Sequence, residues 1–543
     1  MRKIKRFAAL AAAAILAVSM LAACGGGKEA AAPAEAAPAA STEAAAPAEK
    51  PSGVSDKTLT VALQGEPGLL IPDIQFAGNH VYSVMRMMYE PLITYKTGTT
   101  ELAENSIVKS IEWTDDLHAN IELNDKVRFQ NGDPVTTADI QYMFELGVVG
   151  PVTSYWSVYD PAQFEIQDDT HMTLVLGSPW GQAEQMMSFQ MYMVPNKSIL
   201  EAAGGLDVTD QYLDGCGTGK YKMKEWIPGQ SITLERDDNY WDQDNLGYYK
   251  EVKFVFVADA SAREMTIKSG DANVAYEAQL SDYPIYQNDP DVKCILTDTG
   301  KAGVIWLNSG KEGSPFKDEK VREAMGYLID VAAMKNVVFS GFGSYCDTII
   351  SPMNEMYDGK TPAEPSPVDV EKAKALLAEA GYADGFTVQI PCMNAVSPQI
   401  TMIQENLAKA NITVETQVLE LGAYFGLLGS GDYDMMSSAM ENAYYSEGVK
   451  NTDGADFSYL ECFGGCGYND PEYSAIVMKA LQTRDMTERK AAYADLQEYY
   501  RAHHISIGTY TSTTLTLTSP DVEGIVEFGT NVLDMSNVYS TAN

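Results

Sequence analysis

Basic residues are scarce in this 543-residue chain. Its 38 lysines and arginines stand against 75 aspartates and glutamates, which gives a formal charge of −37 at pH 7. Such an acidic surface repels phosphate backbones and anionic lipid, so nucleic-acid binding is not expected. The simplest interpretation is that the charge keeps the protein soluble; selection for cationic ligands is the alternative. The length predicts two or three lobes, and 45% hydrophobic residues suffice for their cores.

Histidine and the common catalytic motifs are also scarce. None of the five histidines begins an H-E-x-x-H motif, and the chain has no G-x-S-x-G elbow. The run GCGTGK at 215–220 resembles a phosphate loop, but only three residues separate its outer glycines. Tyr221 then stands where Ser or Thr would hold magnesium. The sequence therefore indicates no catalytic residue, no cofactor and no metal site, and a secreted hydrolase is the rival class.

Long apolar runs are missing too. Residues 7–20 form an uncharged run of 14 residues, whereas a bilayer span needs ~20. Four basic residues precede this run, and Leu21-Ala22-Ala23-Cys24 follows it. This order is typical of an export signal, here residues 1–23. The last four residues resemble the lipobox of bacterial lipoproteins, which implies that Cys24 carries a diacylglycerol and begins the mature chain.

Large apolar residues are almost absent from the next stretch, residues 24–56. It consists mainly of Ala, Pro, Glu, Gly and Ser, so it cannot bury enough surface to fold and is expected to be a disordered leash. Removal of 1–23 leaves 34 basic and 75 acidic residues, a charge of −41. No later segment approaches 18 apolar residues, so the lipid would be the only membrane attachment.

Cysteines are few for an exported chain of this length. Six follow Cys24, and an even number permits disulfides, although their pairing cannot be deduced. Three residues separate Cys462 from Cys466, and no histidine lies near them. A small loop disulfide or two free thiols are therefore expected there rather than zinc. The other four are Cys216, Cys294, Cys346 and Cys392.

Local patterns predict a mixed α/β protein. The run 58–63 has strand composition, as do 252–257 and 387–390, and these runs alternate with predicted helices. Asp318 is expected to cap one helix, and Asp470-Pro471 to start another that extends through Leu481. The apolar positions of the first helix share one face: Val321, Ala324, Met325, Leu328 and Ile329.

A third helix is expected to begin at Ser366-Pro367-Val368-Asp369. Ser366 would be the N-cap, Pro367 the first helical residue and Asp369 a first-turn acid. Gly381 would end it. Its predicted buried positions are Val370, Ala373, Leu377 and Ala380.

Several stretches occur together in a recognisable order. They are MYEPLITY (88–95), VRFQNGDPVTTADI (127–140), GTGKYKMKEWIPGQ (217–230), NYW (239–241), VREAMGYLID (321–330), AKALLAEAGY (373–382) and GDYD (431–434). These stretches occur in the same order as in one known family, and they follow a lipobox. Together they resemble the oligopeptide-, dipeptide- and nickel-binding family, family 5, of bacterial extracellular solute-binding proteins. The resemblance covers roughly residues 57–540.

The resemblance implies a two-lobed, periplasmic-binding-protein-like α/β fold that closes on its ligand by a hinge. The first lobe would comprise 57–303 and 505–543, with 74–212 as an extra subdomain, and the second lobe 304–504. Buried crossings are expected near Val304–Asn308 and Ile505–Tyr510. The implied partners are the permease and ATPase subunits of an ABC transporter and a small solute. The protein would be a monomer, lipid-anchored on the extracytoplasmic face of the cell membrane.

In this family an extended peptide pairs with strand edges from both lobes. One edge would be Gln64-Gly-Glu-Pro-Gly68, and the other 438–445. The residues expected to line the site are Gln64, Glu66, Trp306, Asn308, Met440, Glu441, Asn442, Tyr444 and Tyr445.

The second edge departs from the family pattern. Peptide-binding members usually place an Asp where Ala443 stands, and that Asp holds the peptide's α-ammonium. Glu66 or Glu441 could replace it. No arginine occurs from Glu323 to Thr483 to hold a terminal carboxylate. A peptide is the favoured ligand, an oligosaccharide or another neutral solute the alternative, and small cationic or chelated ligands come last. Nickel is disfavoured because the only histidines of that lobe are 503 and 504.

Overall fold

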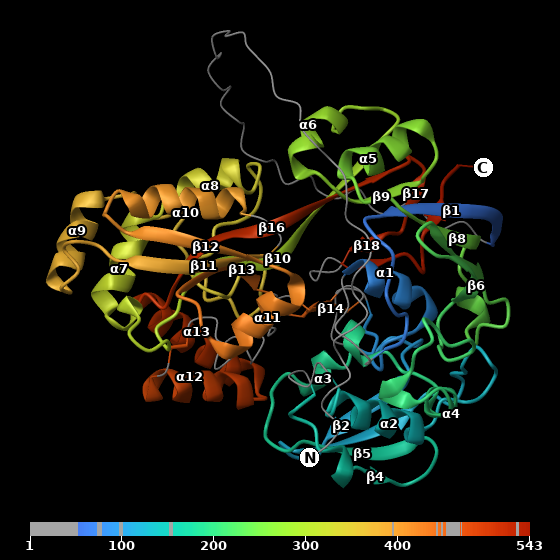
Figure 1. Ribbon diagram of the computed structural model, residues 1–543. Helices are drawn as coiled ribbons and strands as arrows, with labels where there is room; N and C mark the ends of the chain where they lie inside the picture. Colours follow the sequence, from blue (N-terminus) through green and yellow to red (C-terminus); the bar gives the residue numbers. More distant parts are fainter. Residues whose placement is uncertain are drawn as a thin grey trace, which may run out of the picture. The chain divides into compact units, whose positions relative to one another are not determined.

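Strand β1 (Ser55–Leu63) lies inside an eight-stranded mixed sheet of the computed structural model (Figure 1). It runs parallel to both neighbours, β8 and β9. Leu59, Val61 and Leu63 on one face and Ala62 on the other are fully buried, as a strand covered on both faces requires. The sheet has the order β13-β10-β16-β9-β1-β8-β7-β6. Its other strands are β6 (Tyr221–Ile227), β7 (Ser231–Arg236), β8 (Tyr249–Phe256), β9 (Val274–Ala278), β10 (Lys293–Leu307), β13 (Met435–Met440) and β16 (Ser506–Thr518).

The expected signal and Cys24 lie outside the described part of the chain, as do Cys462 and Cys466. All described residues belong to one compact unit, Ala48–Asn543. The structure describes residues 53–72, 79–96, 101–150, 156–393, 396–440, 444–446, 449–451, 467–468, 470–527 and 532–542.

Residues 79–202 add a separate four-stranded antiparallel sheet, in the order β2-β3-β5-β4. The longest helix of this region, α2, begins with a capping box in which the backbone N–H of Thr136 donates to the carboxylate of Asp139. The elements are α1 (Asn79–Met88), β2 (Val108–Trp113), β3 (His118–Leu123), α2 (Thr137–Gly147), β4 (Glu165–Ile166), β5 (His171–Val175), α3 (Ala183–Met186) and α4 (Lys197–Ala202).

One helix joins the two strands that flank β1, and a second leads on to β10. Helix α5 (Ala260–Ser269) follows β8 and leads to β9, so this connection passes over β1 in between. Asp259 caps α5 by accepting a hydrogen bond from the Ala262 N–H, and Gly270 ends it in the left-handed conformation. Helix α6 (Tyr283–Tyr286) then leads into β10.

The chain between β10 and β16 forms a second α/β group around the parallel pair β11 and β12. Strand β13 joins this pair to the large sheet, because the Asp434 N–H donates to the Gln389 carbonyl at 3.2 Å. The elements are α7 (Glu319–Leu328), α8 (Val331–Val337), α9 (Val370–Glu379), β11 (Thr387–Met393), α10 (Pro398–Ala408), β12 (Thr413–Leu419), α11 (Leu421–Ser430), β14 (Tyr444–Ser446), β15 (Val449–Asn451), α12 (Pro471–Gln482) and α13 (Met486–Ala502). Short strands β17 (Val522–Glu523), β18 (Val526–Glu527), β19 (Leu533–Asp534) and β20 (Tyr539–Ser540) close the chain.

Most of the local predictions are confirmed. Strands occupy 58–63, 252–256 and 387–390, and α7 and α12 begin at the predicted caps, Asp318 and Asp470. The predicted start of the helix at Ser366 is wrong. Helix α9 begins at Val370, because Asp369 is its N-cap and accepts a hydrogen bond from the Lys372 N–H. In that helix Ala373 and Leu377 are buried, whereas Val370 and Ala380 are half-buried.

The described cysteines Cys216, Cys294, Cys346 and Cys392 are free thiols. Of the helices that the structure describes, none combines the length and the apolar character needed to cross a membrane.

Candidate ligand-binding site

The carboxyl ends of three parallel strands meet beside β10 and β16. Strand β1 lies between β8 and β9, and the chain visits β8 on one side of β1 before it crosses to β9 on the other. In α/β sheets, ligands bind at the carboxyl ends of the strands where such a reversal of strand order occurs. The residues that follow Leu63, Phe256 and Ala278 are therefore expected to contribute to the site.

One buried arginine on α5 fastens two of these strand ends together. Arg263, 3% exposed, donates through Nη1 to the Val257 carbonyl at 2.8 Å, just past β8. Its Nε and Nη2 donate to the carbonyls of Tyr276 and Glu277 at the end of β9, both at 2.7 Å. Glu277 has a left-handed backbone, φ 51°, which costs a non-glycine residue about 1 kcal/mol. The Arg263 bond fixes the carbonyl of this strained residue.

Glu66 holds the predicted edge segment 64–68 that follows β1. Its carboxylate accepts hydrogen bonds from Trp226 Nε1 at 2.6 Å and from the Gly229 N–H at 3.0 Å. One oxygen thus binds the end of β6 and the other the turn between β6 and β7. Gln64 is exposed at the start of the segment. The structure therefore gives Glu66 a positioning role, and Gln64 a side chain that solvent reaches.

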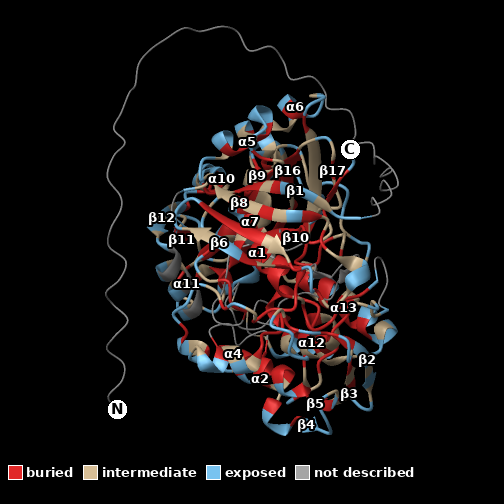
Figure 2. Ribbon diagram, turned by 90° about the vertical axis from the view of Figure 1, so that its right-hand side faces the viewer, coloured by how far each residue is buried: buried red, intermediate tan, exposed pale blue. Residues whose placement is uncertain are grey.

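Strands β10 and β16 continue past this edge and connect the two α/β groups (Figure 1). Leu515 of β16 pairs with Ala278, the last residue of β9, and also with Leu296 of β10. From that row β10 extends to Leu307, and its residues from Thr299 onward are buried, as Figure 2 shows for most of the strand. Two adjacent and largely buried strands thus run through 304–307 and 506–510, where the sequence predicts the crossings.

The pairing of β10 with β16 is interrupted between Asp298 and Ala302. Asp298 holds this irregularity in place, because its carboxylate accepts hydrogen bonds from the Gly300 N–H at 3.0 Å and the Thr511 hydroxyl at 2.9 Å. Thr299 donates across to the Ser512 carbonyl at 2.9 Å. Bulges of this kind bend a strand and often lie next to sites.

The strand register shows which stretch of β10 is level with the two predicted edges. Ala62 lies in the same sheet row as Ala275, Leu517 and Cys294, so segment 64–68 leaves the sheet level with Leu296. From the other direction, Met440 of β13 pairs with Ala302. Along the strand direction both edges are therefore level with 296–302; β13 adjoins this stretch directly, whereas β9 and β16 lie between β1 and β10. Strand β13 ends the strand order of this sheet, and its start lies beside β11. An extended chain could therefore add only along the later part of β13.

Besides Asp298, the ionisable residues Glu277, Lys301 and Glu527 lie near this stretch. Burial raises the pKa of the Glu277 carboxyl, while Lys301, 8% exposed, lowers it by its positive charge. Burial also raises the pKa of Glu527 to about 7, against a hydrogen bond from the Thr514 hydroxyl that lowers it. Charged and hydroxyl groups at a strand edge can fix the orientation of a bound polar chain.

Trp306 and Asn308 lie on the far part of β10. The indole of Trp306 is 1% exposed and packs in the largest apolar core; within the described residues its Nε1 has no hydrogen-bond partner. Asn308 donates to the carbonyls of Gly431 and Tyr433 at 2.9 and 2.8 Å, and its Oδ1 accepts from the Gly310 N–H at 3.0 Å. These bonds hold the GDYD segment, so Asn308 has a structural role here.

The remaining predicted site residues are described only in part. Glu441 and Asn442 lie outside the described residues, as does Ala443. Met440 ends β13, and Tyr444 and Tyr445 belong to β14, which pairs with β15. Their backbone positions place the chain at the predicted edge.

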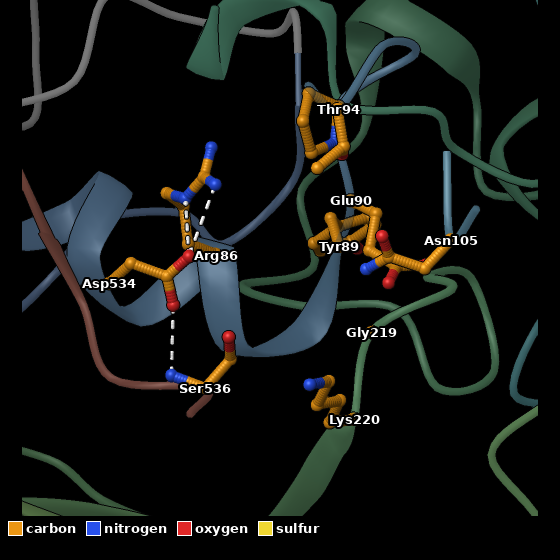
Figure 3. A pocket seen from close by; sticks show the side chains of 10 residues that line it. Arg86, Tyr89, Glu90, Thr94, Asn105, Gly219, Lys220, Asp534 and Ser536 are labelled. Atoms are coloured by element: carbon orange, nitrogen blue, oxygen red, sulfur yellow. Dashed lines mark hydrogen bonds and ion pairs between the residues drawn. The ribbon is translucent and has the colours of Figure 1, made fainter. Parts of the chain in front are cut away.

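A polar cavity of about 20 Å³ lies apart from this edge, between α1, β6 and β19 (Figure 3). It is lined by Arg86, Glu90, Lys220 and Asp534 among others, and its volume suits a single water molecule. Glu90 accepts hydrogen bonds from the Tyr240 hydroxyl at 2.5 Å and Trp241 Nε1 at 3.1 Å. A cavity of this volume is too small for a peptide or a sugar.

The comparison with known proteins agrees with this arrangement. Residues 101–449 match the family described as "Bacterial extracellular solute-binding proteins, family 5 Middle". The chain belongs to this family. Its members are solute-binding proteins, so the binding role expected from the sequence is confirmed at this level.

Individual relatives are distant. The chain is 24% identical over 296 residues to the glutathione-binding protein GsiB of Pectobacterium atrosepticum, covering 52% of this chain and 56% of that protein. It is 28% identical over 239 residues to the oligopeptide-binding protein AppA of Bacillus subtilis, covering 41% and 43%. These alignments span about half the length of the two relatives.

A solved structure confirms the fold. The periplasmic binding protein DppA of Helicobacter pylori, in complex with the peptide STSA, superimposes with a TM-score of 0.74 at 22% identity. The alignment covers 89% of this chain and 98% of that one. The periplasmic-binding-protein-like α/β fold expected from the sequence is therefore confirmed.

Arg263, Glu277 and Glu527 are absent from the predicted site. A signal for Glu277 was available, since an acid directly after the buried run Val274–Tyr276 marks a strand's carboxyl end. Arg263 gives no such signal, because its partners are main-chain carbonyls. Among the described residues, no group of three or more His, Cys, Asp and Glu side chains could hold a metal ion.

Proposed function

We propose that this protein is the lipid-anchored, extracytoplasmic binding component of an ABC importer, and that it captures a peptide by closure of two lobes. One observation carries the proposal: β10 and β16 are the strands that lead from the sheet around β1 to the group around β11, and the two predicted ligand edges flank them. Two neighbouring crossings allow a hinge rotation.

The proposed lobes follow from these crossings. The first contains 57–303 and 505–543, with 74–212 as an extra subdomain, and the second contains 304–504. The ion pair between Arg86 and Asp534, at 3.1 Å, supports the return of the C-terminal segment to the first lobe.

The ligand proposal rests on strand edges. A peptide would add to β13 and to segment 64–68, because an extended backbone satisfies the hydrogen-bonding groups of both edges. Glu277 and Lys301 lie where its polar groups would pass, and Met440, Glu441, Asn442, Tyr444 and Tyr445 would line the opposite side. AppA and DppA are peptide-binding by name, which is consistent with this choice.

Attachment through Cys24 completes the proposal. The lipid would hold the protein at the outer face of the cell membrane, where it delivers solute to permease and ATPase subunits. A monomer suffices for this role.

Native mass spectrometry of protein purified without denaturation tests the ligand, since closed binding proteins retain it. A co-purifying peptide, whose re-addition lowers the radius of gyration in solution scattering, is the expected result. Retention of a glycan with no binding of any peptide would overturn the peptide assignment, and an unchanged radius on saturation would overturn lobe closure.

A further inference from the structure

The connector between α12 and α13 touches the extra subdomain far from the crossings. The Arg484 guanidinium carbon lies 3.4 Å from the ring centre of Trp113, on β2. Its Nη2 also donates to the carbonyls of Asp116 and Trp180, both at 3.4 Å. A guanidinium stacked on an indole face gains both dispersion and cation–π attraction.

Glu184 orients the indole that receives the arginine. Trp113 Nε1 donates to Glu184 Oε2 at 3.0 Å, and the Tyr95 hydroxyl donates to Oε1 at 3.4 Å. The Arg484 charge lowers the pKa of this carboxyl, against burial, which raises it and is the larger effect. The carboxylate therefore fixes the ring edge and attracts the cation above the ring.

The main chains approach closely beside the stack. The Gly181 N–H donates to the Leu481 carbonyl at 2.7 Å, and Gln182 Nε2 donates to the Tyr493 hydroxyl at 3.1 Å. A Cβ at position 181 would lie 2.3 Å from the Thr483 carbonyl oxygen, so only glycine permits this approach.

The α12–α13 hairpin is fixed to the second α/β group. Arg501 of α13 binds Asp347 through Nε at 2.7 Å and Asp358 through Nη1 at 2.6 Å. Gln497 donates to the Met356 carbonyl at 2.8 Å. These bonds tie the hairpin to the second group, although its Leu481, Tyr493 and Leu496 also share an apolar core with Trp180 and Ala183. Trp113, Gly181 and Glu184 precede β10 and belong to the other proposed lobe.

We infer that Trp113, Gly181, Glu184, Leu481 and Arg484 form a latch that stabilises the closed state and so sets ligand affinity without touching the ligand. The inference rests on the proposed function, because rotation about β10 and β16 would have to break this contact. A contact made only in the closed state raises the closed population, and the apparent affinity rises by the same factor.

The test replaces Arg484 by alanine and compares it with Lys479→Ala. Lys479 lies on the same hairpin and pairs with the exposed Asp495 at 3.5 Å, its one ion pair among the described residues, so the control removes the same charge. The probes are amide exchange of the ligand-free protein at 176–184 and 479–485, and calorimetry with tetra-alanine. Arg484→Ala should accelerate exchange at both segments at least tenfold and weaken tetra-alanine binding about three- to tenfold, and Lys479→Ala should change neither.

Unchanged exchange and unchanged affinity in Arg484→Ala would overturn the latch. Faster exchange with unchanged affinity would overturn it too, because the contact would then be a fixed interface. Arg484→Lys keeps the charge but loses the planar stack, so it should show an intermediate effect if Arg484→Ala folds poorly. If wild-type protein does not bind tetra-alanine, the solute that co-purifies with it replaces tetra-alanine in the calorimetry, because exchange alone does not distinguish a latch from a fixed interface.

Discussion

Arg86 and Asp534 form an ion pair inside the protein, with 3.1 Å between guanidinium Nη2 and carboxylate Oδ2, although 448 residues separate them. Their side chains are 6% and 5% exposed, and the Arg86 charge lowers the pKa of Asp534 against burial, which raises it and is the larger single effect. The second carboxylate oxygen accepts from the Ser536 N–H at 2.8 Å (Figure 3). The pair fastens the C-terminal segment to α1.

Asp534→Ala should therefore destabilise the protein by about 3–5 kcal/mol, since it leaves the Arg86 guanidinium buried without its counter-charge. Urea unfolding followed by circular dichroism measures the change. The double variant Arg86→Met/Asp534→Ala should regain part of the loss because no unpaired charge remains. A single variant within about 1 kcal/mol of wild type would contradict the argument.

Contacts between residues far apart in the chain, such as this ion pair, could not be predicted from the sequence, whereas some local elements could. Helix α7 was predictable because Asp318 and the apolar face from Val321 to Leu328 lie within one short window. At 366–370 the window contains two candidate caps, Ser366 and Asp369, and periodicity does not choose between them. The structure chooses Asp369, and Pro367 remains outside the helix.

Only those parts of the candidate site that lie within a local sequence pattern could be predicted. The segment after β1 and the crossings could be predicted from strand composition and family resemblance. Arg263 could not, because its acceptors are backbone carbonyls of Val257, Tyr276 and Glu277, whose positions exist only once β8 and β9 flank β1. The positioning role of Glu66 was missed for the same reason: its partners lie some 160 residues away.

The crossings should tolerate no added side chain at Gly508. A Cβ there would lie 1.9 Å from the Cys346 carbonyl oxygen, next to the Cys346–Thr509 hydrogen bond. Gly508→Ala should cost at least about 1–3 kcal/mol through overpacking and should also weaken ligand binding. The matched control is Gly326→Ala in α7, where nothing lies within 4 Å, and it should stabilise the protein by about 1 kcal/mol. Thermal unfolding of both variants checks the contrast, and equal effects would refute it.

Stability should decline as pH rises because of Glu90. Burial raises its pKa to about 7, while hydrogen bonds from Tyr240 and Trp241 lower it. The unfolded chain releases this proton near pH 4.5, so between about 4.5 and 7 the folded state holds more protons than the unfolded state. The contribution is fully present below pH 4.5 and is lost by pH 7 and above, at most about 3 kcal/mol.

Glu90→Gln should therefore flatten the decline in unfolding free energy between pH 5 and pH 8. Urea titrations at several pH values give the slope, and the difference between wild type and variant isolates Glu90 from other carboxyls. Glu415→Gln, at an exposed position of β12, should keep the wild-type slope. Parallel slopes for wild type and Glu90→Gln would show that Glu90 does not titrate there.

Membrane attachment should depend on Cys24. The proposed anchor is the lipid on Cys24, since the uncharged run before it, residues 7–20, is shorter than a bilayer span. Cys24→Ser should leave the precursor uncleaved or release the protein to the medium, as fractionation and immunoblotting would show. Normal processing with unchanged membrane retention would refute lipidation at this residue.

The last prediction concerns the amino end of the ligand. Ala443 offers no carboxylate where family members usually hold a peptide's α-ammonium. Glu66 could replace it only by sharing or giving up its bonds to Trp226 and Gly229. Binding energy should then come mainly from backbone pairing at 64–68 and 438–445, with a contribution from Tyr444 or Tyr445.

Amino-acetylation of a bound peptide should accordingly cost less than about 1.5 kcal/mol, roughly tenfold in affinity. Alanine at whichever of Tyr444 and Tyr445 faces the ligand should cost more. Calorimetry on one free and one acetylated peptide, with both tyrosine variants, compares the two contributions directly. A hundredfold loss on acetylation would instead mean that a carboxylate holds the ammonium. Glu66→Gln, Glu277→Gln and Glu441→Gln would then identify it, because only the variant at the true anchor should bind both peptides equally.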